Sequence, residues 1–342
     1  MSEDIKRKQK TGKSKGPAVV CIGGGTGHST LLRGLRKVTN DITAIVTVSD
    51  DGGGSGILRD ELGMPPPGDI RSCMQALSNA EPTIEKLMEY RFESGSLSGQ
   101  SFGNLFLAAI NGISESFDKA VIKMGEVLSI TGRVLPVTID DINLWAEFED
   151  GSRVTGESKI TAAKTGKKNR IKRIGLEPAD ARVLPECIDA VECADVIILG
   201  PGSLYTSIIP NLLVGGLTGA IVNSNALKIY ICNVMTQPGE TDGYSVSEHI
   251  SDIFNHAGMK LFDFCIANDT PASREILERY IKSGAEPVII DEDAVNALGI
   301  KLIKVQVAAG YGDYARHDPD KLAREILRLF IEKAPTKLYG NR

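Results

Sequence analysis

The segment that most constrains the fold is an apolar run that breaks into glycines and then continues with the spacing of a helix. Residues 18–22 are apolar, glycine occupies four of the next five positions, and apolar residues recur at helical intervals after position 28. This pattern is typical of a strand, a glycine-rich loop and a helix. Glycine lets a ligand approach the backbone closely, and the helix start offers unpaired N–H groups with partial positive charge.

We therefore expect this first glycine loop to bind an anionic, phosphorylated ligand, with a tight turn that binds nothing as the alternative. The loop residues are Gly23, Gly24, Gly25, Thr26 and Gly27. No Gly-Lys-Ser/Thr follows them, which excludes a P-loop nucleoside triphosphatase. His28 replaces the last glycine of the dinucleotide pattern Gly-x-Gly-x-x-Gly. Asp50 stands where a ribose-binding acid is found in such folds, but a dehydrogenase is the weaker interpretation, and no nicotinamide cofactor is expected.

Composition narrows the class of protein. The chain has 342 residues, of which 42% are hydrophobic, enough for a large α/β core. Its net charge of −5 argues against a dedicated nucleic-acid binder. No apolar run reaches the roughly 18 residues of a membrane span, and the lysine-rich start lacks the apolar segment of a signal peptide, so we expect a cytoplasmic protein. The six cysteines form no Cys-x-x-Cys pair and are expected to be buried, reduced thiols.

Apolar strands alternate with helical patterns along most of the chain, which predicts an α/β fold with a mainly parallel sheet. The expected strands are 18–22, 42–48, 195–199, 228–233, 263–267, 287–290 and 301–305. The expected helices are 29–37, 70–79, 83–90, 103–113, 117–130, 205–213, 215–226, 244–257, 272–282 and 319–333.

One region breaks this alternation. Residues 134–158 alternate with period two around Asp150-Gly151, which predicts an antiparallel β-hairpin. Residues 164–173 carry six basic side chains and are expected to form an exposed connector, with a contact to an acidic ligand or partner as the alternative. We expect a disordered basic N-terminus at 1–16, a single α/β domain at 17–333 with a hairpin and basic-loop insertion at about 134–176, and a C-terminal tail at 334–342.

Acidic residues follow the second predicted strand. Asp50 and Asp51 lead into a glycine-rich loop, and Asp69 follows three prolines at a predicted helix start. Paired carboxylates suit Mg²⁺ beside a diphosphate, or general-base catalysis. The alternatives are that one acid of the pair caps a turn and that Asp69 is only the N-cap of its helix. These three residues are the candidate metal ligands and the candidate catalytic residues.

A second glycine loop follows a buried strand at residues 200–207, and a polar loop follows the next strand at 233–241. Open α/β sheets bind ligands at such strand ends, so we expect these loops to contact a phosphate, sugar or base. The candidate binding residues there are Gly200, Gly202, Ser203, Thr206, Ser207, Asn233, Thr236 and Gln237.

The order of these motifs resembles the 2-phospho-L-lactate transferase-related, CofD-like family and, within it, the bacterial gluconeogenesis-factor branch. The resemblance runs from about residue 17 to 330. It is carried by residues 22–27, 49–55, 67–71, 103–105, 200–207 and 233–241 and by Arg-His-Asp at 316–318.

The resemblance implies a Rossmann-like three-layer α/β/α fold and a nucleotide-diphosphate ligand, with Asn104 and Arg316 added to the binding residues. The transferase branch uses a guanosine-diphosphate-linked phospholactate, a deazaflavin alcohol and Mg²⁺. The bacterial branch is associated with UDP-sugars, cell shape and growth on gluconeogenic carbon sources. Gly-Pro-Gly-Ser at 200–203 and the basic hairpin region 134–176 favour the bacterial branch.

These implications lead to two alternatives. The first is a non-catalytic binder of a nucleotide-sugar such as UDP-GlcNAc or UDP-Glc, with cell-wall synthesis proteins as partners and a homo-oligomer as its assembly. The second is a Mg²⁺-dependent transferase-like enzyme, in which the metal stabilises charge while an alcohol displaces a nucleoside monophosphate.

Overall fold

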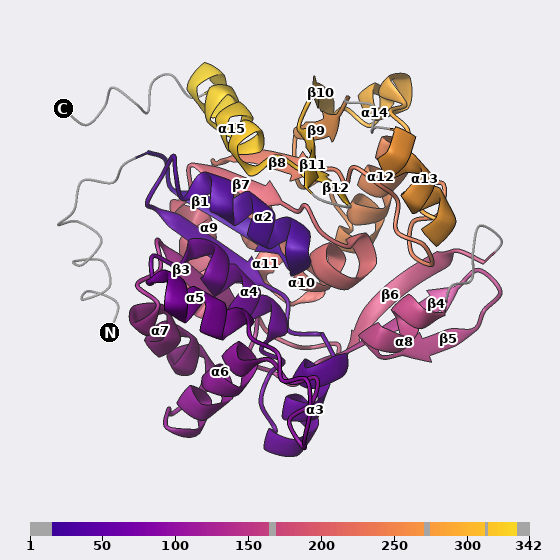
Figure 1. Cartoon of the computed structure of the whole chain (residues 1–342). Helices are drawn as coiled ribbons and strands as arrows, with labels where there is room; N and C mark the ends of the chain where they lie inside the picture. The colour runs from indigo at the N-terminus through magenta and orange to yellow at the C-terminus, as the bar shows by residue number, and fades with distance from the viewer. Residues whose placement is uncertain (1–15, 164–168, 270–273, 312–313, 334–342) are drawn as a thin grey trace, which may run out of the picture.

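The centre of the molecule is a seven-stranded parallel sheet (Figure 1). The computed structural model describes residues 16–163, 169–269, 274–311 and 314–333. The strand order is β10-β9-β8-β7-β1-β2-β3. The strands are β1 (Val19–Gly23), β2 (Ile42–Val46), β3 (Arg133–Pro136), β7 (Val196–Leu199), β8 (Leu227–Ile231), β9 (Phe264–Asn268) and β10 (Lys301–Val305).

This order reverses direction between β1 and β7. The chain runs outward from β1 through β2 to β3, then returns to β7 on the other side of β1 and continues to β10. Ile22 pairs with Leu199 in register, so β1 and β7 end side by side. Such a switch point is where open α/β sheets bind their ligands. The predicted Rossmann-like α/β fold with a mainly parallel sheet is confirmed.

Helices cover both faces of the sheet, because successive strand residues point to opposite sides. Val19 and Cys21 of β1 pack in one core, whereas Val20 and Ile22 pack in the other. The first core is covered by α2 (Gly25–Leu35), α4 (Gly68–Leu77), α6 (Phe102–Gly112), α7 (Phe117–Val127) and α15 (Pro319–Lys333). The second core is covered by α9 (Pro185–Cys193), α11 (Leu217–Asn223) and α12 (Val246–Ala257).

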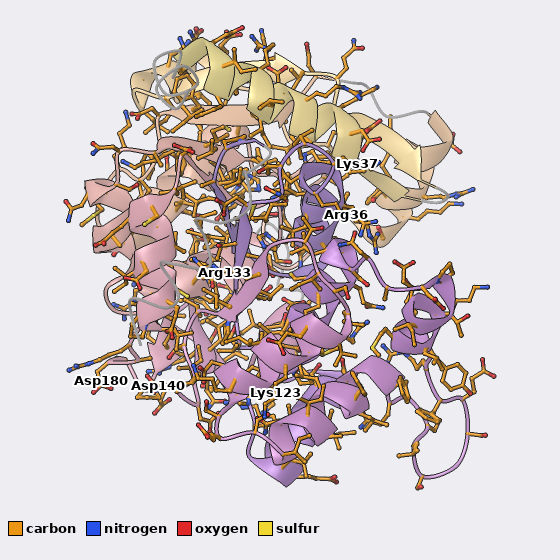
Figure 2. All side chains as sticks on the ribbon, turned by 90° about the vertical axis from the view of Figure 1, so that its left-hand side faces the viewer. Arg36, Lys37, Lys123, Arg133, Asp140 and Asp180 are labelled. Carbon is orange, nitrogen blue, oxygen red and sulfur yellow. The ribbon has the colours of Figure 1, made fainter. Side chains whose placement is uncertain are left out.

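Polar contacts tie α2 to its neighbours at the end remote from the glycine loop. Lys37, just after α2, pairs with Asp320 of α15 at 2.7 Å, and Arg36 donates to the carbonyl of Ser78 beyond α4 (Figure 2). The remaining helices are α3 (Gly53–Leu62), α5 (Pro82–Glu89), α8 (Glu157–Ala162), the π-helix η2 (Leu204–Ile208), α10 (Ile209–Leu213), α13 (Arg274–Ser283) and α14 (Glu292–Ala297). Within the described ranges, no helix is long and apolar enough to cross a membrane.

The insertion forms a separate three-stranded sheet beside the main one (Figure 1). Its order is β5-β4-β6, with β4 (Asn143–Phe148), β5 (Arg153–Thr155) and β6 (Ile171–Glu177). The predicted hairpin turn at Asp150-Gly151 is confirmed between β4 and β5. Two expectations were wrong. Residues 134–136 belong to β3 of the parallel sheet, and residues 171–173 of the expected basic connector begin β6, because Ile171 is buried there as a strand residue.

Other differences follow from contacts that local patterns do not reveal. The helix α3 occupies the expected glycine loop after Asp51, and α2 begins at Gly25 rather than at residue 29. Residues 287–290 form isolated bridges with Met235 and Ser245 instead of a strand. The hairpin of β11 (Ala308–Tyr311) and β12 (Tyr314–His317) was not expected from the sequence. The expected disordered N-terminus and C-terminal tail lie outside the described residues, apart from residue 16.

Candidate functional site

A cavity of about 560 Å³ opens at the switch point between β1 and β7. Both glycine loops and the polar loop after β8 form its wall. The predicted residues that line it are Gly24, Gly25, Thr26, Gly27, Gly202, Ser203, Ser207, Asn233, Thr236 and Gln237. Three elements distant in sequence therefore meet around one space, as the strand-end positions of their motifs predicted.

The two glycine loops touch each other. A Cβ atom on Gly202 would lie 3.0 Å from the carbonyl oxygen of Gly24, and a Cβ on Gly24 would overlap Asp69 and lie 2.9 Å from Thr47 Cγ2. Gly25 has a φ of +71°, a conformation that favours glycine. The glycines therefore permit contact between the loops as well as access to the cavity.

Side chains of the polar loop hold the second glycine loop in place. Asn233 accepts from the Gly202 N–H at 3.3 Å and donates to the Gly202 carbonyl at 2.8 Å. Ser203 donates to Gln237 at 2.6 Å, and Thr236 accepts from the Glu286 N–H at 2.9 Å. These side chains were expected to bind a base or sugar. In the structure they bond to protein groups, and their contact with a ligand stays a prediction.

Asp69 belongs to α4, but its carboxylate faces the first residue of α2. Its carboxylate accepts a hydrogen bond from the Gly25 N–H, while α4, which carries it, has no side-chain cap. The alternative, that Asp69 is only the N-cap of its helix, is therefore wrong. Burial, together with the negative charge of Asp50, raises the pKa of Asp69 to about 6. The start of α2 thus already faces one carboxyl group.

Glu240 has the corresponding position at the second glycine loop. It is 2% exposed and accepts hydrogen bonds from the Tyr205 N–H and from Gln237. Burial, together with the charge of Glu157, raises the pKa of Glu240 to about 8. The Oε2 atom of Glu240 has no partner. Glu240 lies in the polar loop at 233–241 but was not among the residues predicted there.

Glu157, at the start of α8 in the insertion, lies between these groups and was also missed. It accepts a hydrogen bond from Thr206, which is buried behind the second loop. Burial, together with the charges of Asp50, Asp51 and Asp69, raises the pKa of Glu157 to about 7. No local sequence pattern marks this residue, because its neighbours come from segments about 50 to 110 positions away.

The Asp50–Asp51 pair joins the loop after β2 to the insertion. Asp50 accepts from the Gly52 N–H at 2.9 Å, and Asp51 accepts from the Ser158 N–H at 2.8 Å. Burial raises the pKa of Asp50. Among the described residues, no three His, Cys, Asp or Glu side chains converge closely enough to hold a metal ion by themselves. Any Mg²⁺ here would need oxygen ligands from water or from a bound ligand as well.

Asn104, Gly23 and Gly200 are not among the residues that line the cavity. Asn104 accepts from Arg71 at 2.9 Å and donates to Ser55 at 3.5 Å, on the side of the acidic residues. Gly23 ends β1, and Gly200 follows β7 with a φ of +76°. Arg316 lies on β12 opposite Ala309, and its side chain is outside the described part of the structure.

The lining also includes residues that the sequence analysis did not select. Thr30 comes from α2, Thr161 from α8, Tyr280 from α13 and His317 from β12. Other additions are Pro201, Val234, Met235, Pro238, Ser283 and Ala285. The lining within the described residues contains neither lysine nor arginine, and backbone N–H groups at the start of α2 contribute positive potential to it.

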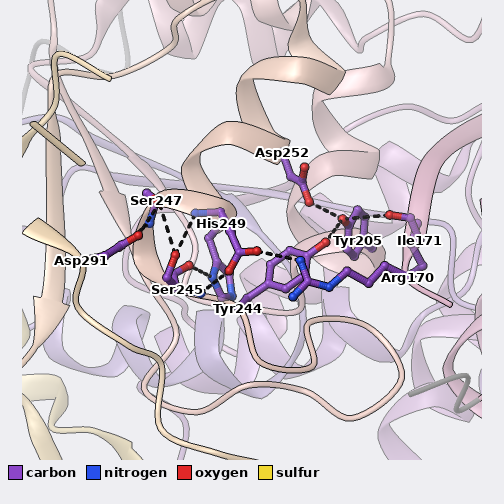
Figure 3. A network of polar contacts seen from close by, with 10 residues as sticks. Arg170, Ile171, Tyr205, Tyr244, Ser245, Ser247, His249, Asp252 and Asp291 are labelled. Carbon is purple, nitrogen blue, oxygen red and sulfur yellow. Dashed lines mark hydrogen bonds and ion pairs between the residues drawn. The ribbon is translucent and has the colours of Figure 1, made fainter. Parts of the chain in front are cut away.

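Behind the second loop, a polar network connects η2 to the insertion and to α12 (Figure 3). Tyr205 donates to Asp252, and its hydroxyl lies 2.9 Å from that of Tyr244. Arg170, just before β6, lies over the Tyr244 ring at 4.7 Å and donates to Glu248 at 2.6 Å. The network fixes the helix that follows the second loop relative to two other parts of the fold.

The fold and its switch-point cavity define an open α/β protein of the Rossmann-like class. Residues 19–308 match the model of the family described as 2-phospho-L-lactate transferase CofD, so the chain belongs to this family. A crystal structure of a protein from Bacillus halodurans matches with a TM-score of 0.88 and 48% identity, covering 92% of this chain and 100% of that protein.

Relatives of similar length carry a functional name. The gluconeogenesis factor of Halalkalibacterium halodurans is 50% identical over 310 residues, covering 90% of this chain and 95% of that protein. The gluconeogenesis factor of Bacillus subtilis is 46% identical over 317 residues, covering 92% of this chain and 99% of that protein. The resemblance inferred from the motifs is therefore confirmed at the level of the family and of this branch.

Proposed function

We propose that this protein is a gluconeogenesis factor that binds a UDP-sugar, such as UDP-GlcNAc or UDP-Glc, in the switch-point cavity. The observation that carries the proposal is the meeting of two glycine loops around one cavity of about 560 Å³. A nucleotide-sugar has a diphosphate with a polar group on each side. It therefore suits a cavity with two loop backbones at its centre and polar side chains around them.

The binding role accounts for the polar contacts better than a catalytic role does. Asn233 and Gln237 hold the second loop rigidly, which prepares a site without placing a nucleophile in it. We propose that this protein acts in the cytoplasm, where its bound or free state signals the supply of nucleotide-sugar to cell-wall synthesis proteins. In this way it would support cell shape and growth on gluconeogenic carbon sources.

The acidic residues fit a hard cation, because they offer carboxylate oxygens whose charge is poorly compensated. Asp50 and Asp69 both have raised pKa values, because burial and a neighbouring carboxylate, Asp51 for Asp50 and Asp50 for Asp69, disfavour their charged forms. Asp50, Asp51 and Asp69 would hold the ion. Mg²⁺ would supply positive charge that offsets the negative charge of the diphosphate, since the described residues of the cavity lining include no lysine or arginine.

A transferase-like activity is the second candidate function. The observation that favours it is the pKa of Asp69 and of Glu157, raised to about 6 and about 7, because groups that titrate near neutral pH suit general-base catalysis. In that case a nucleoside monophosphate would be released from the bound ligand when an alcohol is present. Chromatography of the nucleotide after incubation with Mg²⁺ and alcohols would detect the product.

A thermal-shift and calorimetry panel tests the binding function. UDP-GlcNAc, UDP-Glc, UDP, GDP and NAD⁺ are compared with and without Mg²⁺. A ligand at a hundredfold excess over Kd stabilises the folded protein by about 2.7 kcal/mol. We expect the UDP-sugars to give the largest shift, and Asp69→Asn to reduce the Mg²⁺-dependent part of it. Equal or absent shifts for all five compounds would contradict the proposal.

A further inference from the structure

We propose that His317 selects the orientation of the ligand by accepting a hydrogen bond from an N–H or O–H of its nucleoside or sugar portion. This inference rests on the proposed function and adds to it. It predicts that a ligand group with an N–H or O–H, rather than the diphosphate, contacts the end of β12, where His317 lies.

The position of His317 carries the inference. His317 is one of the residues that line the cavity, and it is only 6% exposed. The ring donates a hydrogen bond to the backbone carbonyl of Cys232, the residue that follows β8. The Nε2 atom is buried and has no partner. A buried polar atom without a partner is energetically costly, and at a cavity wall a bound ligand can supply the missing partner.

The bond to Cys232 determines what that partner must be. A neutral imidazole has one N–H donor and one acceptor nitrogen. Because the donor bonds to the Cys232 carbonyl and Nε2 is the nitrogen without a partner, Nε2 is the acceptor. Burial lowers the pKa of His317 to about 4, so the ring stays neutral at physiological pH. A carbonyl or phosphate oxygen would repel this nitrogen, whereas an imide N–H or a hydroxyl would bind it.

Two other histidines provide an internal comparison. His28 and His249 are also fully buried and have ring nitrogens without partners. Neither lines the cavity, since His28 packs beneath Gly23 and His249 bonds to the Ser245 carbonyl at 2.8 Å. Of these three histidines, His317 is the one whose unpartnered nitrogen belongs to a residue of the cavity wall.

Two substitutions separate the roles of the ring nitrogens. In His317→Asn, the side-chain amide can keep the bond to the Cys232 carbonyl but does not reach the Nε2 position. In His317→Gln, the amide oxygen can replace the Nε2 acceptor while the bond to Cys232 is lost. We expect calorimetry to show that His317→Asn binds UDP-GlcNAc and UDP-Glc at least about tenfold more weakly than the wild-type protein does. His317→Gln should retain more affinity but have the lower melting temperature.

Ligand analogues identify the donor. N3-methyl-uracil and 2′-deoxy derivatives of the same UDP-sugar, and UDP without the sugar, each lack one candidate donor. The analogue that lacks the donor facing His317 should bind the wild-type protein about tenfold more weakly and should lose no further affinity in His317→Asn. Wild-type affinity in His317→Asn, or an equal loss in both variants, would overturn the inference while leaving the proposed function intact.

The same titrations also test the proposed function independently. If the wild-type protein binds none of the UDP-sugars, the proposed function fails and this inference fails with it. If His317→Asn does not fold, the analogues are compared on the wild-type protein and on His317→Gln. An analogue that binds both proteins more weakly than the parent UDP-sugar does supports the inference. If no analogue binds more weakly than the parent, the inference is overturned.

Discussion

The two glycine loops have the same overall plan but are fixed in different ways. Each follows a central strand, begins a helix and faces a carboxyl group with a raised pKa, Asp69 at the first and Glu240 at the second. Three residues after Gly25, His28 is buried with both ring nitrogens unpartnered. Three residues after Gly202, Tyr205 instead bonds to a network that reaches the insertion and α12.

Packing around the glycines constrains both loops, but the second loop is held in addition by polar contacts with distant elements. The first loop has steric constraints at Gly24, where any Cβ would meet Asp69 and Thr47. The second loop depends on hydrogen bonds that substitution can remove without steric conflict. Packing and polar anchoring therefore predict different responses to mutation and to pH.

The largest expected effect is at the first loop. Gly24→Ala should lower the free energy of unfolding by about 2–3 kcal/mol, because the added Cβ overlaps Asp69 in a closely packed region. Urea denaturation measures the change. Gly219→Ala is the matched control: it lies in α11 with nothing within 4 Å of an added Cβ and should be neutral or stabilising. Wild-type stability in Gly24→Ala would show that the first loop is not held by packing.

A smaller effect is expected from the network behind the second loop. Tyr205→Phe removes the hydroxyl that bonds to Asp252 and contacts Tyr244, so we expect a loss of about 1–3 kcal/mol in the free energy of unfolding. Tyr90→Phe, at an exposed tyrosine, should change it by less than about 0.5 kcal/mol. Equal stabilities of the two variants in the same denaturation assay would remove the distinction between the loops.

The smallest expected effect concerns pH. The pKa of Glu240 is raised from 4.5 to about 8 in the folded protein, so its contribution to stability is present below about pH 4.5 and is lost as pH rises through 8. Glu240→Gln keeps the shape but removes the charge. At pH 8.5 it should be more stable than the wild type by about 1 kcal/mol or more, with the difference shrinking towards pH 5.

Thermal unfolding between pH 5 and pH 9 measures this difference, and Asp69→Asn is the matched substitution at the first loop. Because the pKa of Asp69 is raised only to about 6, its stability difference should already be complete near pH 7. Parallel pH profiles for the two variants would mean that the two carboxyl groups do not differ as described.

Sequence patterns predicted the parts of the site that depend on local chemistry. Gly24–Gly27 and Gly202–Ser203 stand directly after apolar strands, and strand ends of a parallel sheet meet at one edge, so the cavity could be located. Glu157 and Glu240 could not be predicted, because their roles depend on contacts with Thr206 and Tyr205 from other segments.

The same limit explains the errors in the fold. The period-two pattern from residue 134 combined two different strands, β3 of the parallel sheet and β4 of the antiparallel sheet. The two strands carry similar apolar residues, so the sequence pattern does not separate them. The basic residues up to Arg173 concealed β6, whose inward side chains Ile171 and Ile174 are buried beneath the charged ones. The basic residues correctly predicted an exposed face of this strand, but they did not indicate that it pairs with β4.

The central claim is that both glycine loops contact a single ligand. Hydrogen–deuterium exchange of the wild-type protein, with and without saturating UDP-GlcNAc, tests it most directly. The account predicts slower exchange at both Gly25–Thr30 and Ser203–Ser207, with one ligand bound per chain in calorimetry of the same sample. Protection confined to one loop, or to neither, would contradict the claim.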